Sequence, residues 1–136
     1  MTLPARASDP DAVRGSLTAL IVLFTCYTSL SVVGVVLAKR WLTAAAVDVR
    51  SGNLLTGAVV GAAAGASAYA LSFALWLVIS TRAPLSVAYP VAVGVTSVLT
   101  IIAGALVFGE RPTAVQLLGS VVVLAGVGLL ASGLRR

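Results

Sequence analysis

Long apolar segments alternate with short polar ones along almost the whole chain. Each apolar run holds about 20 residues or more, the length at which a helix crosses a bilayer of ~30 Å. The pattern predicts helices at about 17–38, 54–80, 85–108 and 114–134, joined by polar connectors at 39–53, 81–84 and 109–113. The predicted fold is therefore all-α, a four-helix transmembrane bundle at residues 17–136.

The composition supports a membrane setting. Of the 136 residues, 60% are apolar and only 10% are charged, more apolar surface than a soluble core of this size could bury. The polar segment 1–16 is interrupted by Pro4 and Pro10, and we expect it to be disordered or to lie on the surface. The first apolar run is longer than that of a signal peptide and lacks a small-residue cleavage site, so it is expected to remain as a helix.

The residues needed for common catalytic sites are missing from the predicted helices. The chain has no histidine and a single cysteine, Cys26, and no acidic residue falls inside an apolar run. The four acidic residues are Asp9, Asp11, Asp48 and Glu110. We therefore expect no enzymatic activity, no metal site and no cofactor.

The basic residues give no preferred membrane orientation. With four helices, one side carries Arg6, Arg14, Arg82, Arg135 and Arg136, and the other carries Lys39, Arg40, Arg50 and Arg111. Five against four is no bias under the positive-inside rule. Either a partner protein fixes the orientation, or the chain inserts both ways and pairs antiparallel with itself. Both alternatives imply assembly.

Small residues mark two predicted packing faces. Gly57, Gly61 and Gly65 recur every fourth residue and continue into Tyr69, so this stripe either only packs against another helix or ends at a cavity. Gly119 and Gly126 are seven residues apart and form one seam on the fourth helix, which we interpret as the dimerisation helix.

The segment "SVAYPVAVG" places Tyr89 and Pro90 in the first turns of the third helix. Because Pro90 cannot donate a hydrogen bond to the carbonyl of Ser86, a kink is predicted there. Tyr89 is either an aromatic anchor at the membrane interface or part of a pocket, since its hydroxyl group needs a partner.

The segments "PLSVAYPVAVG" and "ALVFGERPTAVQLLGSVVVLAGVGLL" resemble the second half of small multidrug resistance proteins, in the drug/metabolite transporter superfamily. The resemblance continues through "YALSFALW" and "VVGVVLAK" and covers the chain from Leu17. It implies a four-helix unit that works as a dimer, often antiparallel and of dual topology.

Two positions depart from the cation-exporting members of that family. Where they carry a glutamate three residues before the helix-one glycine, this chain has Ser31 before Gly34. Where they carry a tryptophan three residues after the helix-three tyrosine, it has Ala92. A buried cation needs a countercharge, so proton-coupled export of cations through a carboxylate is not expected.

"VAYP" instead resembles the branch that moves lipid-linked sugars, such as aminoarabinose on undecaprenyl phosphate. The leading hypothesis is a flippase in the bacterial cytoplasmic membrane, acting as a homodimer or as a heterodimer with a similar chain. Its substrate would be a lipid-linked or amphipathic anion. The predicted binding residues are Tyr27, Ser31, Tyr69 and Tyr89, with Lys39 meeting a phosphate; Lys39 could equally be a snorkelling anchor.

Two alternatives remain open. The chain could export small organic cations or metabolites without the usual carboxylate. It could also be a non-transporting subunit that binds another membrane protein, which the missing charges would suit.

Overall fold

The computed structural model describes residues 10–133, apart from the side chains of residues 10–13, 131 and 133. This part of the chain is entirely helical between its connections, in the order α1 (Pro10–Arg50), α2 (Gly57–Ser80), α3 (Leu85–Phe108) and α4 (Ala114–Gly133). Residues 1–9 of the predicted tail and residue 134 of the predicted fourth helix lie outside the described residues. By length and composition, α1, α2 and α3 can each cross a membrane, and α4 holds a shorter apolar stretch, Ala114–Leu130.

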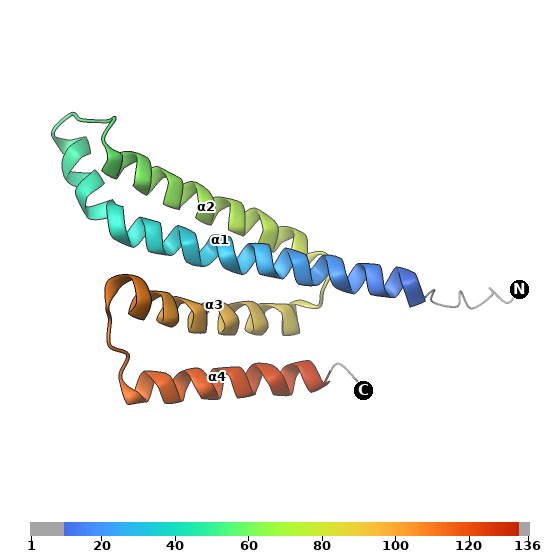
Figure 1. Ribbon diagram of the computed structural model, residues 1–136. Coiled ribbons are helices and arrows are strands. Elements are labelled where there is room, and N and C mark those ends of the chain that lie inside the picture. Colours follow the sequence, from blue (N-terminus) through green and yellow to red (C-terminus); the bar gives the residue numbers. More distant parts are fainter. Residues whose placement is uncertain (1–9, 134–136) are drawn as a thin grey trace, which may run out of the picture.

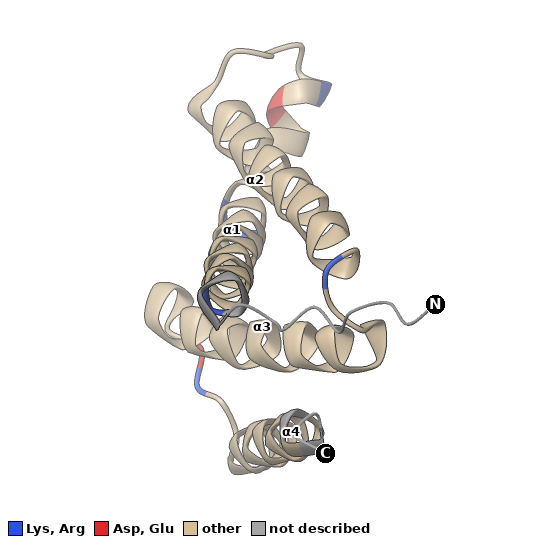
Figure 2. Ribbon diagram, turned by 90° about the vertical axis from the view of Figure 1, so that its right-hand side faces the viewer, with Lys and Arg blue, Asp and Glu red and all other residues tan. Residues whose placement is uncertain are grey.

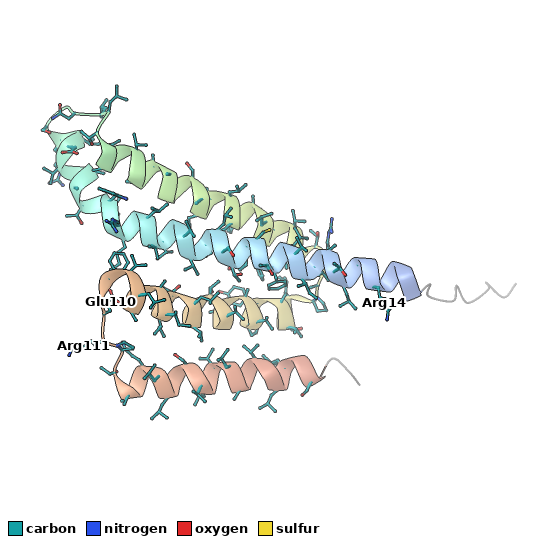
Figure 3. All side chains as sticks on the ribbon, viewed as in Figure 1. Arg14, Glu110 and Arg111 are labelled. Atoms are coloured by element: carbon teal, nitrogen blue, oxygen red, sulfur yellow. The ribbon has the colours of Figure 1, made fainter. Side chains whose placement is uncertain are left out.

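The helices form a tight pair and two further layers (Figure 1). α2 runs back along α1, α3 packs across α1, and α4 contacts α3 but neither of the other two helices. No charged residue lies within α2, α3 or α4; between residues 10 and 133 the charged residues belong to α1 and to the connections (Figure 2). Arg14 lies at one end of the molecule and Arg111 at the other, as the alternating helices require (Figure 3).

α1 is much longer than the sequence pattern predicts. Its 41 residues follow about 60 Å of helix axis, roughly twice the thickness of a bilayer core, and the last turns bend toward the start of α2 (Figure 1). Residues 10–16, predicted as part of a disordered or surface tail, and residues 39–50, predicted as a connector, belong to this helix instead. The alanines at 44–46 are strong helix formers, and Gly52, with φ of 84°, ends the helix by accepting a left-handed conformation. The amide groups of Gly52 and Asn53 donate to the carbonyl groups of Val49 and Asp48.

A side-chain link fixes the turn between α1 and α2. The Thr56 hydroxyl oxygen accepts a hydrogen bond from the amide of Val59 at 3.3 Å, which caps the start of α2. The same hydroxyl group donates to the Asp48 carboxylate at 2.6 Å. Asp48 therefore joins the last turn of α1 to the first turn of α2.

Glycines bring α1 and α2 into backbone contact. A Cβ atom added at Gly65 would lie 2.7 Å from the amide nitrogen of Ala38, and one at Gly34 would lie 2.8 Å from that of Tyr69. A Cβ atom at Gly61 would meet the Trp41 ring, whereas Gly57 has nothing within 4 Å. Two members of the predicted glycine stripe thus pack within the chain.

The predicted dimer seam on α4 is open within this chain. A Cβ atom at Gly119 or Gly126 would meet nothing within 4 Å. α3 approaches α4 closely at Gly94, where an added Cβ atom would meet Val123 and Val127. Large apolar side chains of α4 remain exposed, including Val115 at 78% and Leu129 at 73%.

Pro90, where a kink is predicted, lies inside α3, and the helix continues on both sides of it. It lines an apolar groove between α3 and α4 together with Tyr89 and Gly126. At its other end α3 stops at Gly109, whose φ of 64° is left-handed.

Candidate functional site

An open cavity of about 340 Å³ lies among α1, α2 and α3. It is lined by Tyr27 and Ser31 of α1, by Tyr69, Ser72, Phe73 and Trp76 of α2, and by Tyr89, Ala92, Val93 and Thr96 of α3. Four of the five residues predicted to bind substrate meet here: Tyr27, Ser31, Tyr69 and Tyr89. Lys39 does not line this cavity.

Helical spacing explains why these residues meet. The cavity-facing residues of α2 fall at positions 69, 72, 73 and 76, and those of α3 at 89, 92, 93 and 96. Both sets follow the i, i+3, i+4, i+7 pattern of a single helix face. On α1, Tyr27 and Ser31 are one turn apart on one face.

Trp76, which the sequence analysis did not select, connects the tyrosines. Its ring centroid lies 5.7 Å from that of Tyr27 and 5.9 Å from that of Tyr89. The second pair meets edge to face, a favourable geometry for two aromatic rings. Phe24 extends the cluster with its ring 6.5 Å from that of Tyr27. Aromatic side chains from three helices thus surround the cavity.

The hydroxyl groups of the cavity fall into two kinds. Ser72 donates to the carbonyl of Tyr69, and Thr96 to the carbonyl of Ala92, each at 2.7 Å, so their protons are used within their own helices. Between described residues, no hydrogen bond engages the phenol groups of the three tyrosines or the hydroxyl group of Ser31. These four hydroxyl groups can bind a ligand or water.

The cavity is uncharged and open to one side. None of its ten lining residues is acidic or basic. Tyr69 and Tyr89 are 52% and 59% exposed, so this single chain does not close the cavity. Ala92, where the cation exporters of the resembled family carry tryptophan, is 1% exposed at the cavity wall, and Trp76 of α2 supplies an indole ring instead.

Lys39 pairs with Glu110. Its ammonium group forms an ion pair with the Glu110 carboxylate, which lies just after α3, and its Nζ atom lies 4.7 Å from the centre of the Phe108 ring. Both side chains of the ion pair are about half exposed, at 54% and 51%. A pair this exposed contributes roughly 0.2–1 kcal/mol to stability.

A second hollow adjoins the cavity through Tyr69. This apolar groove of about 360 Å³ runs between α1 and α2. We name it the Lys39 groove, lined by Gly34, Val35, Ala38, Lys39, Leu42, Gly65, Ala66 and Tyr69. Lys39 supplies its one charge, and Tyr69 belongs to both the groove and the cavity.

The described residues contain no group of three or more His, Cys, Asp or Glu side chains that could hold a metal ion. Comparisons with protein-family models, with curated proteins and with solved structures gave no match.

Proposed function

We propose that this chain is an integral membrane transporter subunit that moves a lipid-linked or amphipathic anionic substrate across the bilayer. The observation that carries the proposal is the uncharged cavity of aromatic rings and hydroxyl groups, placed between helices of membrane-spanning length. The similarity of the sequence to small multidrug resistance proteins is compatible with this function.

The cavity chemistry suits a sugar-like polar group. The C–H faces of a sugar ring stack on aromatic side chains, and its hydroxyl groups bond to hydroxyl groups of the protein. Tyr27, Trp76 and Tyr89 present the rings, and Ser31 and Tyr69 add hydroxyl groups. Without a countercharge nearby, a neutral polar group enters this site at a lower desolvation cost than an ion.

Apolar grooves beside the cavity suit a lipid chain. The Lys39 groove meets the cavity at Tyr69, and the groove between α3 and α4 meets it at Tyr89 and Val93. A substrate whose polar group binds in the cavity can therefore place its lipid chain against the apolar side chains of a groove. This arrangement agrees with a lipid-linked substrate.

Dimerisation is part of the proposal. One chain leaves Tyr69 and Tyr89 more than half exposed at the cavity, and on α4 it leaves open space where Cβ atoms of Gly119 and Gly126 would stand. A second chain packed on α4 would use the small residues as lipid-embedded helices commonly do. The even charge distribution is compatible with an antiparallel pair.

Export of an organic cation is the second candidate, because the same rings favour it. A quaternary ammonium group binds the faces of tryptophan and tyrosine without needing a carboxylate. Trp76 and its two tyrosine neighbours provide such faces.

Transport into sealed vesicles tests both candidates. The full chain is reconstituted, and uptake of a radiolabelled short-chain isoprenyl-phosphoryl hexose is compared with that of tetraethylammonium. We expect uptake of the hexose and a loss of about tenfold in Trp76→Ala, equivalent to about 1.4 kcal/mol. Leu106→Ala is the matched control, since Leu106 is 80% exposed and lines none of the hollows described above.

The outcomes separate the candidates. Selective uptake of tetraethylammonium, sensitive to Trp76→Ala, would replace the lipid proposal with cation export. No uptake of either probe, together with one stoichiometric protein that co-purifies, would point to the non-transporting subunit.

A further inference from the structure

We propose that the Lys39 groove binds an anionic phospholipid of the surrounding membrane, with Glu110 acting as a built-in competitor for the lipid phosphate. The inference shares with the proposed function the placement of the chain in a bilayer and the Lys39 groove, which there accommodates the lipid chain of a substrate. It does not require transport, and the cavity residues other than Tyr69 take no part in it.

The groove has the two parts that such a lipid needs. Its walls are apolar along Gly34, Val35, Ala66 and Leu42, and Lys39 is the one charged residue that lines it. A lipid chain can lie along the apolar walls while its phosphate meets the ammonium group. Basic residues near a membrane surface attract anionic lipids in this manner.

The position of Lys39 along α1 fits the headgroup depth. Lys39 lies eight residues after Ser31 of the cavity, a rise of about 12 Å along the helix axis. Arg40 directly follows Lys39 and Glu110 pairs with it, whereas α2 and α3 carry no charged residue within their spans. A lipid with its phosphate at Lys39 therefore directs its chain toward Tyr69 and the bilayer interior.

Glu110 occupies the place of that phosphate. Its carboxylate pairs with the Lys39 ammonium group, and both side chains are about half exposed. An exposed pair of this kind is weak, so an incoming phosphate can replace the carboxylate without breaking a buried contact. Phe108, with its ring centre 4.7 Å from Nζ, keeps the ammonium group at the groove after Glu110 withdraws.

The exchange leads to an unusual expectation. If Glu110 competes with the lipid, removing its charge should strengthen binding of an anionic lipid. If the ion pair serves only to hold α1 against the connection after α3, removing either partner should weaken the fold equally and should not improve lipid binding.

The test is a lipid titration followed by native mass spectrometry of the full chain in detergent. The probes are dioleoylphosphatidylglycerol and dioleoylphosphatidylcholine, which share their chains and differ in net charge. We expect preferential binding of phosphatidylglycerol, about fivefold tighter in Glu110→Gln and about tenfold weaker in Lys39→Gln. The neighbouring Arg40→Gln, whose guanidinium lies 5.5 Å from the Trp41 ring centre, is the matched control and should change little.

A second variant tests the position of the lipid's acyl chain without altering any charge. Ala66 is exposed and lines the groove, so Ala66→Leu should fill it and weaken binding of phosphatidylglycerol while the helix content stays unchanged. Unchanged or weaker binding in Glu110→Gln, or equal binding of the two lipids, would overturn the inference. Because no flux is measured, these results stand apart from the transport assay.

Discussion

The α1–α2 pair and α4 use the same kind of residue in opposite ways. In the pair, Gly34 and Gly65 let two backbones meet, and an added Cβ atom at either position would lie within 3.0 Å of the other helix. In α4, Gly119 and Gly126 have open space where a Cβ atom would stand. The comparison shows that a stripe of small residues does not by itself tell whether another helix of the same chain packs against it.

The largest expected effect comes from breaking the tight pair. Gly65→Ala places a methyl group 2.7 Å from the amide nitrogen of Ala38, where backbone must move to make room. We expect a loss of about 1–3 kcal/mol in the free energy of unfolding. Unfolding of the chain in mixed detergent and dodecyl sulfate micelles, followed by circular dichroism, measures it.

Gly57→Ala is the control for this loss. Gly57 belongs to the same stripe but has nothing within 4 Å, so the added methyl group meets no obstacle. Its effect should stay below about 1 kcal/mol, since alanine is the better helix former. Equal losses in the two variants would mean that the α1–α2 contact does not limit stability.

A somewhat smaller effect is expected when the open seam is filled. Gly119→Leu adds a side chain at an exposed position where an added Cβ atom would meet nothing within 4 Å, so the stability of the single chain should hardly change. If a second copy packs there, the dissociation constant of the dimer should rise about tenfold, which corresponds to a loss of about 1.4 kcal/mol in the free energy of association. Energy transfer between labelled chains in micelles measures the dimer fraction.

Gly57→Leu is matched to that variant, because its added side chain also enters open space, but on α2. A dimer fraction that falls in both variants, or in neither, would contradict assembly through the α4 seam.

Effects of similar or smaller size are expected at the helix caps of the two regions. Thr56→Ala removes the cap of α2 and the hydrogen bond to Asp48 of α1. We expect a loss of about 1–2 kcal/mol, toward the upper end reported for cap substitutions. The unfolding titration used for Gly65→Ala measures it.

Thr113→Ala removes a cap that is only local. Thr113 and Gln116 exchange two hydrogen bonds at the start of α4, at 2.8 and 3.3 Å, and neither reaches another helix. Its cost should be about 0.5–1 kcal/mol. A cost equal to that of Thr56→Ala would show that the Asp48 link adds nothing.

Much of the architecture could be predicted from the sequence, because runs of apolar residues report directly on helices of membrane length. The start and end of α3 agree with the predicted range 85–108. The extension of α1 to Arg50 was missed because a break in hydrophobicity was interpreted as a break in the helix. The alanines at 44–46 favoured a helix there all the same.

The candidate cavity was predictable in part. Tyr69 and Tyr89 were selected for their chemistry, and residues seven positions further along each helix, Trp76 and Thr96, share their faces. That spacing would have added both residues. The Lys39–Glu110 pair could not be found in this way, because 71 positions separate its members and only the crossing of α1 over α3 brings them together.

The contact between Gly34 and Tyr69 has a consequence for ligand size. The amide nitrogen of Tyr69 lies 2.8 Å from where a Gly34 Cβ atom would stand, and Tyr69 of α2 and Ser31 of α1 both line the cavity. Because Gly34 has no side chain, α1 and α2 approach each other closely beside the cavity, and this close approach limits the width of the cavity. A Gly34→Ala chain that still folds must hold α1 and α2 further apart, and its cavity should then admit a bulkier polar group and bind a small one less tightly.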